Sequence, residues 1–104
     1  MRQCAYIIHM QEILTALTDP TRRAALAILA DGGEHCVCKL MARLDASQSR
    51  MSRHMKILAQ AGIVTGRRDA QWVRYRRNPQ LAPELSAVID AVLEAERRFE
   101  KDIA

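Results

Sequence analysis

The sequence predicts a mainly α-helical fold with one β-hairpin, a winged helix-turn-helix of about five helices and two strands. Three observations support this prediction. Apolar residues recur at helical spacing along most of the chain, two short alternating segments follow residue 62, and basic residues gather in the same region. At 104 residues the chain is long enough for one compact core. We therefore expect a single domain over residues 1–104.

Two helices separated by a capping sequence are predicted in the first third of the chain. Apolar residues at helical spacing indicate a helix over residues 10–18. Asp19, or the threonine before it, can cap the next helix, and Pro20 suits a first helical turn. The second helix is expected over residues 20–30 and should end at the glycine pair that begins with Gly32.

A helix-turn-helix is predicted over residues 37–61. A short helix over residues 37–44 is followed by Asp45 and Ser47, and either of these can cap a second, amphipathic helix that ends at Gly62. The apolar stripe of that helix consists of Met51, Met55, Leu58 and Ala61. Its opposite face carries hydrogen-bond donors and cations, which suits a helix that enters the major groove of DNA.

Residues 63–77 predict a β-hairpin wing, and residues 81–103 predict a final helix. The two alternating segments, 63–65 and 72–75, are joined by a stretch that contains two arginines. Arginines on a hairpin behind a helix-turn-helix can hold a phosphate backbone or enter the minor groove. The final helix has more apolar surface than so small a core needs, so we expect it to form a homodimer interface with the helix over 10–18.

Composition and charge argue against two other classes of protein. No apolar run approaches the roughly 18 residues of a membrane-spanning helix, and Gln11 and Glu12 interrupt the apolar start before any small-residue cleavage site. We therefore expect a cytoplasmic protein without a membrane partner. Neither a βαβ pattern nor a CxxC motif is present, so an enzyme is not predicted. Between Arg50 and Arg77 the only acid is Asp69, which is typical of a phosphate-binding surface or of a well-solvated face.

Two thiols stand one residue apart at Cys36 and Cys38, and one further cysteine, Cys4, precedes them. An odd number of cysteines argues against a disulfide framework and leaves reactive or metal-bound thiols. On a regular helix the side chains at i and i+2 point about 160 to 200° apart, so sharing an ion requires extended backbone there. A disulfide between them would close a strained small ring, which argues against disulfide formation as the main signal.

Four stretches together resemble the ArsR/SmtB family of winged-helix metalloregulators, and most closely its arsenical-resistance repressors. The stretches are DPTRRAALAIL, EHCVCKLMARLDASQ, SQSRMSRHMKILAQAGIV and WVRYRRNP, in an order that spans about residues 13–79. The resemblance implies a homodimer that binds a palindromic operator in double-stranded DNA and leaves it when a toxic thiophilic element binds. It also implies that no cofactor is required for DNA binding.

The resemblance further implies which residues act. Cys36 and Cys38 would bind the inducer, which is expected to be arsenite, antimonite, methylarsenite or a related thiophilic ion, and Cys4 is the candidate for a third ligand. Contacts to DNA are expected from the outer face of the fourth helix, where Arg can read guanine and Gln adenine, and from the wing. These residues are Ser47, Gln48, Ser49, Arg50, Ser52, Arg53, His54, Lys56, Arg67, Arg68 and Arg74. His54 is assigned to DNA contact or to a hydrogen bond within its own helix.

The sequence departs from the family pattern at two places. Met41 stands where arsenic-responsive members carry a further cysteine, and we interpret it as a core residue because a thioether binds a trivalent metalloid weakly. The wing turn at residues 68–71 lacks the glycine of many members. We interpret His35 as an exposed residue near a helix start and His9 as part of the first helix. The last helix lacks the family's Asp-x-His pair, so no zinc site is predicted there.

Several alternatives stay open. Some members bind cadmium or lead through N-terminal cysteines together with a CVC pair, so these ions are also possible inducers. An exogenous thiol can complete the ligand shell in place of Cys4. Cysteines at a helix start can instead respond to oxidants or persulfide. A plain architectural DNA-binding module would respond to no inducer.

Overall fold

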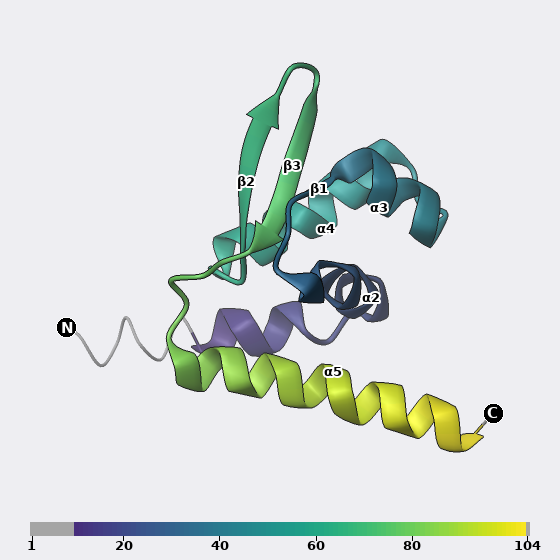
Figure 1. The fold of residues 1–104 in the computed structure, drawn as a ribbon, viewed down its shortest axis with the longest axis vertical. Helices are drawn as coiled ribbons and strands as arrows, with labels where there is room; N and C mark the ends of the chain where they lie inside the picture. Colours follow the sequence, from purple (N-terminus) through teal and green to yellow (C-terminus); the bar gives the residue numbers. More distant parts are fainter. Residues whose placement is uncertain (1–9, 104) are drawn as a thin grey trace.

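The computed structural model describes residues 10–103, which form five α-helices and a small sheet. The β2-β3 hairpin projects away from the helices (Figure 1). The first helix occupies residues 10–16. The elements that follow are α2 (Pro20–Ile28), the 3-10 turn η1 (Leu29–Asp31), β1 (His35–Cys36), α3 (Val37–Leu44), α4 (Gln48–Gln60), β2 (Val64–Asp69), β3 (Trp72–Arg77) and α5 (Pro83–Ile103). This architecture confirms the predicted winged helix-turn-helix.

Single residues mark the boundaries of the helices in and before the helix-turn-helix. Ser47 caps α4, because its side-chain oxygen accepts from the backbone N–H of Arg50. Asp45, the other capping candidate, instead ends α3 in the left-handed region at a φ of 51°. Gly32 closes η1 at a φ of 82°, where a residue without a Cβ meets little steric cost. All three residues have backbone angles outside the right-handed helical region, which marks the boundary in each case.

Asp19 caps α2, as the sequence predicts, by accepting from the backbone N–H groups of Thr21 and Arg22. Burial by itself would raise the pKa of Asp19, but these hydrogen bonds and nearby positive charge together outweigh it and hold the pKa below the ordinary value of 3.8. We expect Asp19→Ala to lower the free energy of unfolding by about 1 kcal/mol near neutral pH.

The pH dependence of this effect has a defined sign. A carboxylate whose pKa is lowered by folding stabilises the protein above its ordinary pKa, and the contribution disappears as the pH falls through the lowered value. Urea unfolding of the wild type and Asp19→Ala should therefore converge in strongly acid solution. Asp19→Asn is the control, because it retains a capping oxygen without a charge. A difference between wild type and Asp19→Ala that persists unchanged at low pH would contradict the assignment.

The sheet contains a strand that the sequence did not predict. Its order is β1-β3-β2, with both pairs antiparallel, and β1 contributes only His35 and Cys36. The expectation of two strands is therefore incomplete, because two residues are too few to show an alternating pattern. The hairpin strands are also longer than predicted, and the turn without glycine passes through Ala70 at a φ of 57°.

The core joins all the helices to the base of the sheet. Helices α2, α3 and α4 pack on one another, β3 contacts α3, and β2 contacts α4. Met41 packs against this core, as predicted. Arg77 ties β3 to α5 through Asp90, at 2.9 Å, so α5 is held at the base of the wing and far from its tip (Figure 1). None of the helices in residues 10–103 has the length and apolar character needed to cross a membrane.

Candidate nucleic-acid interface and thiol pair

The outer face of α4 presents cations that no acid of the described residues neutralises. Met51, Met55 and Leu58 point into the core, which leaves the polar face of the amphipathic helix outside. Five of the predicted DNA-contacting side chains are exposed there: Gln48, Ser49, Arg50, Arg53 and Lys56. Ser52 is half-buried. Within residues 10–103 the three basic side chains of this set form no ion pair, so this face is suited to meeting phosphates and base edges.

The wing differs from α4 because two of its three predicted DNA-contacting arginines have internal carboxylate partners. Arg67 binds Glu34 with two hydrogen bonds, Nε to Oε2 at 3.0 Å and Nη2 to Oε1 at 2.7 Å. The Arg67 guanidinium accordingly holds the pKa of Glu34 below its ordinary value. Arg74 donates from Nε to Asp69 at 2.9 Å. Arg68 is exposed and has no acidic partner in the described part of the chain.

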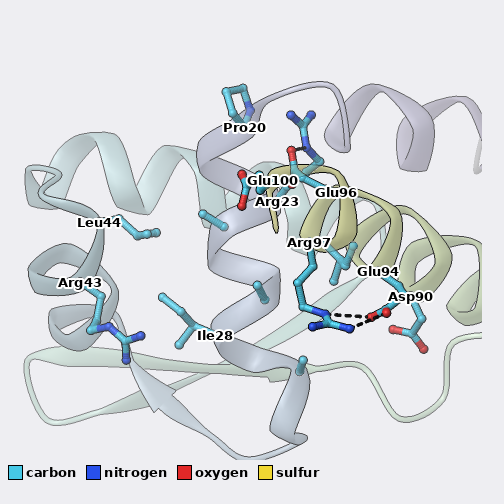
Figure 2. A pocket seen from close by; sticks show the side chains of 14 residues that line it. Pro20, Arg23, Ile28, Arg43, Leu44, Asp90, Glu94, Glu96, Arg97 and Glu100 are labelled. Carbon is cyan, nitrogen blue, oxygen red and sulfur yellow. Dashed lines mark hydrogen bonds and ion pairs between the residues drawn. The ribbon is translucent and has the colours of Figure 1, made fainter. Parts of the chain in front are cut away.

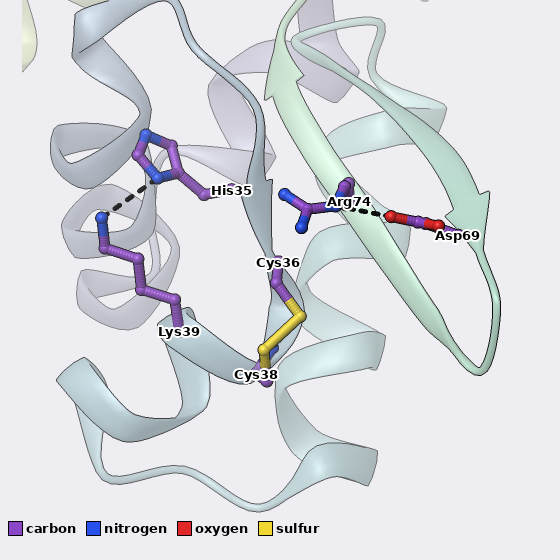
Figure 3. Close-up of a disulfide and its surroundings, with 6 residues drawn as sticks. All are labelled: His35, Cys36, Cys38, Lys39, Asp69 and Arg74. Carbon is purple, nitrogen blue, oxygen red and sulfur yellow. Dashed lines mark hydrogen bonds and ion pairs between the residues drawn. A yellow bond between two sulfur atoms is a disulfide. The ribbon is translucent and has the colours of Figure 1, made fainter.

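The thiol segment and the wing belong to the same sheet. Cys36 lies directly opposite Arg74, and Arg74 lies directly opposite Arg67 on the next strand. Directly opposed residues project their side chains on the same face of a sheet. Cys36, Arg74 and Arg67 therefore form a row across one face, and Figure 3 shows Arg74 beside the two cysteines.

Cys36 and Cys38 meet because the chain changes conformation between them. Cys36 is extended, with φ −63° and ψ 141°, and caps α3, whereas Cys38 lies in the first helical turn. Their Cα atoms are 5.1 Å apart, and their sulfur atoms are paired as a disulfide (Figure 3). The backbone thus brings the two sulfur atoms together, whereas the expectation that a disulfide is not the main signal stays a prediction. The extended residue required for a shared ligand is present.

The first turn of α3 also supports negative charge on the Cys36 sulfur. The backbone N–H of Cys38 donates to the Cys36 Sγ at 3.2 Å. The N-terminus of a helix attracts anions through its free N–H groups and its dipole. The thiolate is the form that binds soft metals and metalloids, so the pair must be reduced before it can hold such an ion.

Other predicted or possible ligands lie away from this pair. The His35 side chain is only 13% exposed, which corrects the expectation of an exposed residue. Its Nε2 lies 2.9 Å from Asp31 and its Nδ1 3.2 Å from Lys39, and its ring points away from the cysteines (Figure 3). Cys4 and His9 lie outside the described residues. Over 10–103, no three His, Cys, Asp or Glu side chains converge on a potential metal site.

Two of the predicted DNA-contacting residues use their side chains in hydrogen bonds within the protein. Ser47 uses its hydroxyl oxygen as the cap of α4. His54 is half-buried, and its Nδ1 lies 3.2 Å from Nη1 of Arg22 on α2. The expected hydrogen bond of His54 within its own helix is therefore replaced by one between helices. No sequence signal identified Arg22 as its partner, because the two residues are 32 positions apart.

Comparison with known proteins matches these features to one family. Residues 19–65 match the model of bacterial regulatory proteins of the arsR family. The chain is 39% identical over 97 residues to the arsenic resistance transcriptional regulator ArsR1 of Pseudomonas putida, covering 88% of this chain and 76% of that protein. The chain belongs to the arsR family. The arsenical resistance operon repressor of Escherichia coli is 34% identical, covering 83% of this chain and 74% of the relative.

Solved structures agree with the assignment of this arsR-family protein. HlyU from Vibrio cholerae superposes with a TM-score of 0.72 at 30% identity, covering 86% of this chain and 94% of that one. The family and fold are those of DNA-binding transcriptional repressors and not of enzymes.

A separate groove on this arsR-family protein is unsuited to DNA. It lies between α2, the end of α3 and the later turns of α5, and Figure 2 shows Arg43 and Leu44 on its far side from α5. Four acids of α5 line it: Asp90, Glu94, Glu96 and Glu100. Two of its arginines are paired with these acids. Phosphates would meet net repulsion along α5, so this groove is not a candidate for the DNA interface, and α4 and the wing stay the predicted one.

The internal partner of Arg67 gives a test of the wing. Glu34→Gln is expected to strengthen DNA binding by this arsR-family protein roughly two- to fivefold at low salt, because a phosphate no longer has to displace a carboxylate. The gain should shrink as salt rises. Fluorescence anisotropy with a labelled duplex measures it. Glu100→Gln is the control, since it changes the net charge equally on α5. Equal gains in both variants would contradict a specific role for Glu34.

Proposed function

We propose that this protein is a homodimeric repressor that leaves a palindromic operator when a trivalent metalloid binds the thiolates of Cys36 and Cys38. The observation that carries the proposal is the position of Cys36. Its backbone pairs with Arg74 of the wing, and its side chain caps α3, the support helix of the helix-turn-helix. A ligand bound to Cys36 therefore acts on the wing and, through α3, on the helix-turn-helix.

The expected mechanism is a shift between two conformers. Binding an ion to both sulfurs pulls on the first turn of α3, and α3 packs directly on α4. In a dimer the two α4 helices must match half-sites about 34 Å apart, so a small displacement weakens both contacts. By linkage, operator DNA must weaken inducer binding by the same factor.

The inducer is expected to be arsenite, antimonite or methylarsenite. Support comes from the soft thiolate ligands and from relatives named as arsenic resistance regulators in Pseudomonas putida and Escherichia coli. Cys4, from the same chain or from the partner, is the proposed third ligand, whereas methylarsenite needs only two thiolates. Cadmium and lead are the alternative inducers that would use the same three cysteines.

Dimerisation is proposed through the first helix and α5. Both helices contribute to the core, yet each also presents large apolar side chains to solvent. Leu14 is 47% exposed, Val88 36% and Phe99 66%. A second copy of the chain would cover these side chains and bring two α4 helices to the two halves of the operator.

Titration of a promoter fragment tests the proposal. The reduced protein, bound to labelled DNA from the promoter of its own gene, is titrated with arsenite, antimonite, methylarsenite, cadmium, lead and zinc, and release is followed by fluorescence anisotropy. Release by trivalent arsenic or antimony, and not by zinc, is the expected result. Tight binding that no ion disturbs would overturn the metalloid proposal.

A thiol-redox repressor is the second candidate, favoured by the pairing of the two sulfur atoms. Hydrogen peroxide would take two electrons and two protons from the thiols, giving the disulfide and two waters. Release by peroxide that dithiothreitol reverses, without release by arsenite, would favour this candidate. Arsenite release from protein kept reduced would favour the first.

A further inference from the structure

Arg22 is the one buried charged residue among those the structure describes, with 9% of its surface exposed. It lies in the first turn of α2, and all three of its guanidinium nitrogens have partners. Nε donates to the carbonyl oxygen of Ala16 at 2.8 Å, and Nη2 to that of Thr15 at 3.4 Å. Nη1 lies 3.2 Å from Nδ1 of His54. A guanidinium can hold three such groups because its donors form a rigid planar fork.

These partners come from two different elements. The carbonyls of Thr15 and Ala16 end the first helix. That of Thr15 also accepts from the backbone N–H of Thr18 at 3.1 Å and from its hydroxyl at 2.6 Å, whereas that of Ala16 accepts from Nε of Arg22. A cation at this position also complements the negative end of the helix dipole. His54 lies in the middle of α4. Arg22 therefore connects the first helix to α4 through one side chain of α2.

The hydrogen bond from Arg22 to His54 defines which imidazole nitrogen is the acceptor. Arginine keeps its proton in proteins, so Nδ1 of His54 must be the acceptor. In the neutral ring the proton is then on Nε2. The two ring nitrogens therefore differ in what they can bind. Nδ1 faces Arg22 in the protein interior, and Nε2 is the nitrogen that can meet another partner.

We propose that Arg22 and His54 form a brace that fixes the orientation of α4 against the first helix, which makes His54 a positioning residue and not a base-reading one. This inference rests on the proposed function, in which the first helix lies at the dimer interface and α4 reads the operator. The brace then connects the interface to the reading helix through hydrogen bonds to a largely buried guanidinium. Its effect is to keep two α4 helices at the spacing of the half-sites.

Two isosteric substitutions separate the brace from a DNA contact. In His54→Asn, the side-chain oxygen occupies nearly the place of Nδ1 and can accept from Arg22, while nothing replaces Nε2. In His54→Gln, the terminal amide reaches instead toward the place of Nε2. His54→Leu removes both polar atoms. The thermal midpoint and dimer content of each variant are measured first, so that unfolding is not mistaken for lost binding.

The readout is discrimination between operators of different half-site spacing. The operator is mapped by footprinting the promoter of the protein's own gene, and affinity is compared with a duplex carrying one extra base pair between half-sites and with a random duplex. We expect His54→Gln and His54→Leu to reduce spacing discrimination about tenfold, with random-duplex affinity unchanged. His54→Asn should remain within about twofold of wild type.

Each remaining outcome overturns the brace. Loss of operator affinity in His54→Asn with retention in His54→Gln would assign His54 to DNA contact. Wild-type discrimination in all three variants would show that the pair contributes only to stability. If the folded wild type bound no duplex specifically, the proposed function itself would fail, a result that does not depend on any variant.

Discussion

Replacing both thiols, Cys36→Ser with Cys38→Ser, is expected to leave operator affinity within about twofold of wild type and to abolish release by arsenite. Serine is among the best helix caps. Its oxygen can accept the hydrogen bond from the backbone N–H of Cys38 that the Cys36 sulfur now accepts, so α3 should keep its first turn. A hydroxyl is a poor ligand for a soft ion. The arsenite concentration that releases half of the DNA should rise at least about 100-fold. That exceeds the loss expected when a group that only supports a metal ligand is removed.

Anisotropy of the labelled operator, measured with and without arsenite, checks this result. Cys4→Ser is measured in parallel and separates the third ligand from the first two. An intermediate loss of sensitivity would make Cys4 a ligand, and no loss would leave two thiolates sufficient. If the double variant failed to bind DNA in metal-free buffer while remaining folded, the cysteines would be structural and the release mechanism would be wrong.

The second large effect concerns α4. We expect Arg53→Ala to weaken operator binding by about 1–3 kcal/mol, roughly five- to 150-fold, because an exposed arginine without an internal partner is free to contact a base or a phosphate. A base contact would relax sequence preference at one position. A phosphate contact would weaken binding to all duplexes. It would also reduce the slope of log affinity against log salt concentration by about one.

Arg43→Ala is the matched control for this measurement. Arg43 is also exposed and cationic, but it lines the groove beside α2 and not the outer face of α4. Its replacement removes the same charge and should change operator affinity by less than about twofold. Equal losses in the two variants would show that net charge, and not the position of Arg53, controls binding.

Local signals were sufficient to predict most of the fold. Asp19 and Ser47 each bind N–H groups two or three residues away, so their capping roles are visible within a few letters of sequence. The stripe that begins at Met51 is likewise a local pattern, and it fixes which side of α4 faces outward. The elements and the exposed face of the predicted interface follow from these short-range features.

Features that depend on tertiary pairing could not be predicted. Arg67 and Glu34 are 33 positions apart, and their contact exists only because β1 adds to the hairpin. The extended conformation of Cys36 has the same cause, since strand pairing ends at that residue and α3 begins at the next. A sequence pattern can place two cysteines near a helix start, but only the register of the sheet decides whether their sulfur atoms meet.

The internal carboxylates of the wing also bear on how the protein searches DNA. On random DNA the phosphates supply nearly all of the binding free energy, so the cost of exchanging Glu34 for a phosphate at Arg67 would be a larger fraction of the total there than at the operator. At the operator, base contacts from α4 add free energy that this exchange does not reduce. The same acid would therefore weaken binding to random DNA and to the operator by a similar factor, which makes release from random DNA fast while the base contacts still hold the protein at the operator.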